Sequence, residues 1–138
     1  MRDTLNRSDV VLGGALYLTA VVTVIYWLDF YFGSSVSAKQ EDWYRIFQRA
    51  FLPADAWMAG CALVAATGLL LRRPFGAKCG LLAGSALVFL ALMDVTFNAQ
   101  NSLYPLAATS NAMQIEILIN VWTLALGGTV IAALWSKS

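Results

Sequence analysis

Four acidic side chains stand inside long apolar stretches of this sequence, where charged groups are rare. Asp29, Asp55, Asp94 and Glu116 each occupy a different stretch, and each is the only formally charged residue of its stretch. A charge within a membrane span costs about 2.5 to 3.5 kcal/mol on insertion scales, and such residues usually mark functional sites. The sequence therefore indicates a carboxylate site.

Amide and phenol side chains accompany the carboxylates at helical spacing. Asn98 and Asn101 follow Asp94 by one and two turns, and Asn120 follows Glu116 by one turn. Carboxylate and amide oxygens suit a hard cation such as Ca²⁺ or Mg²⁺, or an organic amine, and not a soft metal. The predicted ligand- or cation-binding residues are Asp29, Asp55, Asp94, Asn98, Asn101, Glu116, Asn120 and Tyr26.

The absence of histidine excludes several chemistries. It rules out bis-histidine haem, histidine-based zinc sites and every Ser-His or Cys-His nucleophile pair. No C-x-x-C, P-loop or G-x-S-x-G motif occurs, and no Lys lies in an apolar stretch to form a Schiff base. We therefore expect no cofactor, and catalysis would depend on carboxylate acid–base chemistry alone.

The elements that position these groups are predicted to be four membrane-spanning helices. The chain is 59% hydrophobic and 12% charged, and residues 10–32, 54–71, 79–97 and 112–135 each supply about the 20 mostly apolar residues that a span needs. The fold class is an all-α integral membrane protein, a single domain (residues 1–138) forming an antiparallel four-helix bundle in the lipid bilayer. Residues 40–52, with Trp43, Phe47 and Phe51 on one side, predict a short interfacial helix; a plain connecting loop is the alternative.

The basic residues predict the direction of insertion. Six lie at the N-terminus, in the second loop and at the C-terminus: Arg2, Arg7, Arg72, Arg73, Lys78 and Lys137. The other two loops hold three, Lys39, Arg45 and Arg49. The positive-inside rule then places both termini in the cytoplasm of a cell membrane protein. Because alternate helices run in opposite directions, all four carboxylates fall at the outer end. A net charge of +1 without a basic block predicts no nucleic-acid partner.

A row of glycines predicts close packing at the cytoplasmic end. Gly76, Gly80 and Gly84 form two overlapping G-x-x-x-G steps, a pattern that lets helix backbones approach closely. We expect a bundle that is tight there and splayed at the outer end around a polar cavity. The same row is a candidate homodimer face.

Two questions about the carboxylates stay open from sequence. Asp55 and Glu116 come early in their helices, where the macrodipole favours negative charge, so a purely structural role is an alternative for both. The four groups need protons, a bound cation, or pairing with Arg45 or Arg49 from the first loop.

Three functions are compatible with these features. The first is a small membrane protein that binds a small hydrophobic or cationic ligand in an outer-half cavity, with transport as one use of it. The second is a membrane-embedded enzyme acting on a lipid-like substrate. The third is a structural or accessory membrane subunit.

One resemblance is confined to two residues. Asp29 and Asp55, near the outer ends of the first two helices of a small four-helix protein, faintly resemble the sterol-isomerase and sigma-2-receptor superfamily. The chain lacks that family's histidine and longer loops, so the resemblance does not identify the protein.

Overall fold

The computed structural model describes residues 6–138, and within them every regular element is helical. The four long helices are α1 (Arg7–Phe32), α3 (Leu52–Leu70), α4 (Pro74–Gln100) and α5 (Asn111–Leu134). The short helices are α2 (Asp42–Ala50), η1 (Tyr104–Ala108) and η2 (Trp135–Lys137). Four helices are long and apolar enough to cross a membrane, which agrees with the predicted number of spans. Arg2 lies outside the described residues.

Helix boundaries differ most from the prediction in α4. This helix begins at Pro74 rather than residue 79 and continues to Gln100 rather than residue 97. Proline suits the first helical turn because its missing N–H would have no partner there. Lys78, expected in the preceding loop, therefore lies in α4, where it is exposed.

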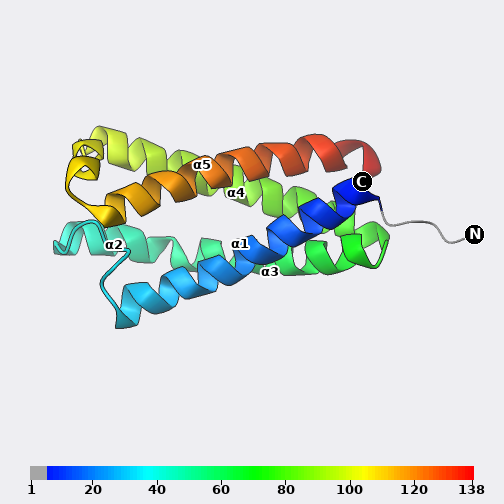
Figure 1. Ribbon diagram of the computed structural model, residues 1–138, viewed down its shortest axis with the longest axis horizontal. Helices are drawn as coiled ribbons and strands as arrows, with labels where there is room; N and C mark the ends of the chain where they lie inside the picture. The colour runs from blue at the N-terminus through cyan, green and yellow to red at the C-terminus, as the bar shows by residue number, and fades with distance from the viewer. Residues whose placement is uncertain (1–5) are drawn as a thin grey trace, which may run out of the picture.

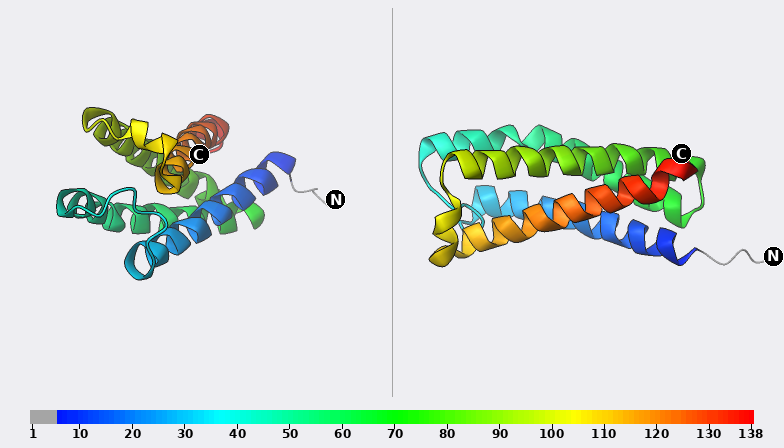
Figure 2. Two further views of the ribbon diagram at one scale, coloured as in Figure 1. Left: turned by 60° about the vertical axis from the view of Figure 1, so that its left-hand side comes forward. Right: turned by 90° about the horizontal axis from the view of Figure 1, so that it is seen from above.

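The long helices pack in chain order. Helix α1 lies against α3, α3 against α4, and α4 against α5. Figure 1 shows the beginning of α1 and the end of α5 at one end of the molecule, and Figure 2 shows α1 standing apart from α4 and α5 at the other end. At that other end α1 and α4 finish and α3 and α5 begin. We call it the carboxylate end, because Asp29, Asp55, Asp94 and Glu116 lie in these parts of the helices.

Glycines allow the closest helix approach at the opposite end. A Cβ atom on Gly68 of α3 would collide with the backbone of Gly76 in α4, so only glycine fits this crossing. Gly80 and Gly84 of the predicted row lie against Leu134, Ile131 and the backbone of α5. All three glycines of the row are buried within the chain. A second copy would have to displace α3 or α5 to use them.

Helix α2 follows the axis of α3 and does not lie across the end of the molecule (Figure 1). Phe51 alone separates the two helices, and Pro53 occupies the first turn of α3. The buried residues of α2 are Tyr44 and Gln48, whereas Trp43, on the aromatic side that the sequence predicts, is 44% exposed. Tyr44 lies in a small second core with Leu103 and Met113, so contacts with the third loop and α5 decide which face of α2 turns inward.

Candidate functional site

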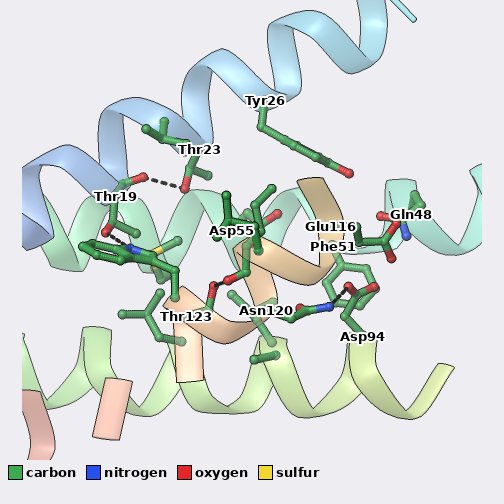
Figure 3. A pocket seen from close by; sticks show the side chains of 18 of the residues that line it. Thr19, Thr23, Tyr26, Gln48, Phe51, Asp55, Asp94, Glu116, Asn120 and Thr123 are labelled. Atoms are coloured by element: carbon green, nitrogen blue, oxygen red, sulfur yellow. Dashed lines mark hydrogen bonds between the residues drawn. The ribbon is translucent and has the colours of Figure 1, made fainter. Parts of the chain in front are cut away.

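A cavity of about 360 Å³ lies between the long helices at the carboxylate end (Figure 3). This volume is within the range of small-molecule sites. Besides three threonines whose hydroxyls bond backbone carbonyls of their own helices, Thr19, Thr23 and Thr123, the polar residues that line it are Tyr26, Gln48, Asp55, Asp94, Glu116 and Asn120. Its apolar walls include Val22 from α1, Met58 from α3, Leu87 and Leu90 from α4, and Ile119 from α5. The cavity thus has an apolar body and a polar end.

The carboxyl groups of Asp94 and Glu116 form a pair at the polar end. One amide nitrogen reaches both of them: Asn98 Nδ2 lies 2.5 Å from Glu116 Oε1 and 3.5 Å from Asp94 Oδ2. Asn98 is completely buried and Glu116 is 5% exposed. Helices α4 and α5 pack along their length, which brings residues from the two helices into contact. We call Asp94 and Glu116 the carboxyl pair.

Each carboxyl group also has a donor of its own. The Tyr44 hydroxyl donates to Glu116 Oε2 at 2.8 Å, and Asn120 Nδ2 donates to Asp94 Oδ2 at 2.8 Å. Asp55 is held separately, by the indole N–H of Trp27 at 2.9 Å. All of these donors are neutral. They orient the carboxyl groups without cancelling a charge.

The cavity opens sideways between α1 and α5. Its rim includes Leu18, Leu118 and Trp122, which are 53%, 68% and 43% exposed. The Trp122 indole N–H donates to Thr19 Oγ1 at 3.0 Å and joins the two helices across the cavity. The opening is therefore bordered by apolar side chains on the outer surface of the molecule.

Two buried polar atoms beside the pair lack a partner among the described residues. They are Gln48 Nε2 and Asn98 Oδ1. Gln48 is 5% exposed and lines the cavity next to Asp94 and Glu116 (Figure 3). An unsatisfied buried donor costs about 1 to 3 kcal/mol. The polar end therefore has spare hydrogen-bonding capacity.

The arginines of the first loop lie elsewhere. Arg45 Nη1 donates to Gln40 Oε1 at 2.9 Å, and its guanidinium stacks 4.9 Å from the Phe30 ring centroid. Arg49 Nε donates to the backbone oxygen of Arg45 at 3.4 Å. Within the described part of the chain, neither arginine forms an ion pair with a carboxylate. The alternative in which Arg45 or Arg49 neutralises the cluster is therefore not what the structure shows.

Three of the predicted site residues, Asp29, Asn101 and Asn98, do not line the cavity. Asp29 Oδ2 accepts the backbone N–H groups of Ser35 and Val36, each at 3.0 Å, and so fixes the turn after α1. Asn101 is exposed and donates to the carbonyl of Phe97 at 2.9 Å. Asn98 lies behind the carboxyl pair and not on the cavity wall. Asp55 lines the cavity and Asp29 does not. The two residues on which the sequence resemblance depended therefore do not belong to one site.

The helix-start alternative applies to one acid only. Asp55 lies in the first turn of α3, where the helix dipole stabilises a negative charge. The first turn of α5 holds no acidic residue, because that helix begins at Asn111 and Glu116 lies more than one turn into it. Position in the helix therefore does not account for Glu116.

Sequence reasoning missed Tyr44, Gln48 and Trp27. Tyr44 and Gln48 are four residues apart, a spacing that places both on one face of a helix, but the aromatic pattern of residues 40–52 favoured a different face. The described residues form no group of three or more acidic, cysteine or histidine side chains arranged to hold a metal ion.

No protein-family model, curated protein or solved structure matches this chain.

Proposed function

We propose that this chain is an integral membrane protein that binds a small amphipathic molecule with a cationic head group. In this proposal the four long helices form an antiparallel bundle in the bilayer, with both termini in the cytoplasm and the carboxylate end toward the outer surface. The ligand places its head at the carboxyl pair and its apolar part between α1 and α5.

Exposed apolar surface supports the membrane location. In each of the four candidate spans, only 33% of the most apolar window is buried within the protein, so most of each window is at least partly exposed. The exposed residues include large apolar side chains such as Ile25, Leu92 and Val121, at 58%, 53% and 62% exposure. Helix α3 has 19 residues, a length of about 28 Å, close to the roughly 30 Å of the hydrocarbon core.

The shape of the cavity supports an amphipathic ligand. Its rim at Leu18 and Leu118 is exposed on the same outer surface that would contact lipid tails. A molecule dissolved in the bilayer could enter there without crossing water. Its apolar part would contact Leu87 and Leu90, and its head would reach Asp94 and Glu116.

The charge of the polar end supports a cationic head. Asp55, Asp94 and Glu116 line one cavity, and their donors are an indole, a phenol and amides. The rings of Tyr26 and Phe51 also line the cavity, and aromatic faces attract cations. The observation that carries the proposal is this set of three carboxyl groups in a largely apolar cavity, with no lysine or arginine among the described residues that line it.

Binding can be tested with a probe of permanent charge. Octyltrimethylammonium is titrated calorimetrically into the protein in lipid nanodiscs, with empty nanodiscs as the blank. We expect saturable binding that weakens by at least about tenfold, or 1.4 kcal/mol, when Asp94→Asn and Glu116→Gln are combined. Both changes are nearly isosteric and replace an ionisable carboxyl group by a neutral amide.

Two controls make the result specific. Asp29→Asn removes a carboxylate outside the cavity and should leave the affinity unchanged. Octyl sulfate has the same chain and the opposite charge, and it should not compete. Equal affinity of the wild type and a correctly folded double variant would overturn the proposal.

A further inference from the structure

The two acids of the carboxyl pair share a hydrogen-bond donor. Asn98 Nδ2 approaches both groups, at 2.5 Å from Glu116 and 3.5 Å from Asp94, so the two acids share one donor in a buried site. Two negative charges so close together repel strongly where the dielectric is low. Paired carboxyl groups in such sites commonly share a single proton.

The groups that face the pair supply no positive charge. The other polar and titratable side chains around Asp94 and Glu116 come from five elements. They are Tyr26 of α1, Tyr44 and Gln48 of α2, Asp55 of α3, Asn120 of α5 and Tyr104 of η1. None of these described side chains is a lysine or arginine, and Asp55 would add a further negative charge. Tyr104 lies outside the long helices, and its pKa is raised by burial and then by the negative charges of Asp94 and Glu116. It does not offset them.

We propose that Asp94 and Glu116 share one proton when no ligand is bound, and that a cationic head group entering the cavity releases this proton. The site then exchanges one proton for one cation. This inference rests on the proposed function, because it concerns the same site and ligand.

The exchange balances in atoms and charge. Before binding, one carboxyl O–H bond and one carboxylate give the pair a charge of minus one. On binding, that O–H bond breaks, its electron pair stays on the carboxylate oxygen, and the proton passes to water. Two carboxylates and one monovalent cation again sum to minus one. Because the net charge of the site is unchanged, neither the cation nor the second carboxylate is left as an uncompensated buried charge.

The side-chain amide of Gln48 is placed to stabilise the carboxyl pair after the pair has lost its shared proton. Its Nε2 is buried, lines the cavity and has no partner among the described residues. It lies beside Asp94, and loss of the shared proton gives the pair a further acceptor oxygen. A donor is thus already in place for the second carboxylate.

The experiment counts the protons released on binding. Octyltrimethylammonium has no exchangeable proton, so any proton released comes from the protein. Titration calorimetry at about pH 7 in phosphate and in Tris, buffers with different ionisation enthalpies, gives the number per bound cation. We expect about one for the wild type, and an affinity that falls nearly tenfold for each pH unit lowered around neutrality.

Variants locate the proton on the pair. Glu116→Gln or Asp94→Asn leaves one carboxylate and no shared proton, so release should fall to near zero and the affinity should lose its pH dependence. Asp29→Asn, outside the cavity, should still release one proton. The two single variants serve as alternatives if one of them fails to fold.

The outcomes separate this inference from the proposed function. A wild-type protein that binds the cation without releasing a proton overturns the exchange and leaves the binding function standing. Release that persists in both single variants places the proton on another group and also overturns it. No binding of the cation by the wild type overturns the proposed function together with the exchange.

Discussion

Tyr44 and Glu116 are 72 positions apart in the chain, and the hydroxyl of the first donates to Oε2 of the second at 2.8 Å in a buried site. The bond fastens α2 to α5. Tyr44 is completely buried, and its ring packs near Phe97 of α4, with the centroids 6.3 Å apart. One side chain of a short helix therefore orients one member of the carboxyl pair.

Replacing Tyr44 by phenylalanine should lower stability. Tyr44→Phe keeps the ring and removes the donor, leaving a buried carboxyl oxygen without its partner, at a cost of about 1 to 3 kcal/mol. Thermal unfolding in detergent measures the change. Tyr17→Phe is the matched control, because Tyr17 is 57% exposed. Equal melting temperatures for the two variants would show that the Tyr44 bond adds no stability.

Substitution of Asp29 should destabilise the loop between α1 and α2 and leave ligand binding unchanged. Asp29→Ala removes the oxygen that accepts the N–H groups of Ser35 and Val36. Loss of these bonds should destabilise the turn by about 1 kcal/mol or more and speed proteolysis between α1 and α2. Asp29→Asn retains a side-chain acceptor and should be milder. A marked loss of cation affinity in either variant would contradict the separation of Asp29 from the cavity.

Two glycines of one helix should respond in opposite directions to the same substitution. Gly68→Ala places a methyl group against the backbone of Gly76, and such overpacking costs about 1 to 3 kcal/mol or more. Around Gly60 nothing lies within 4 Å of an added Cβ atom. Gly60→Ala should therefore stabilise α3 by up to about 1 kcal/mol through helix propensity. Detergent melting curves of the two variants compare them directly, and a tolerated Gly68→Ala would argue against the close α3–α4 crossing.

The direction of insertion has its own test. The six-to-three distribution of basic residues predicts a cytoplasmic C-terminus. A fluorescent protein fused after Ser138 should fluoresce, while alkaline phosphatase fused at the same place should be inactive. Active phosphatase with a dark fluorescent fusion would reverse the orientation, and the carboxylate end would then face the cytoplasm.

The sequence determined the helices and the end at which the acids gather. Helix formation and length depend on local apolar character, and each chain reversal returns the next helix in the opposite direction. Asp29 and Asp94, late in their helices, therefore lie at the same end as Asp55 and Glu116, early in theirs. The same local information located the glycines of the close packing.

Only the tertiary structure decided which of these residues share a site. That choice depends on the offset and separation of neighbouring helices, which no single helix encodes. Helix α1 leaves α5 at the carboxylate end and opens the cavity, while Asp29, on the last turns of α1, bonds the adjacent loop. Tyr44 and Gln48 become part of the site because α2 continues along the axis of α3 and turns one face toward α5. The glycine row packs against α3 and α5 of its own chain, a choice of partner that the G-x-x-x-G spacing alone does not make.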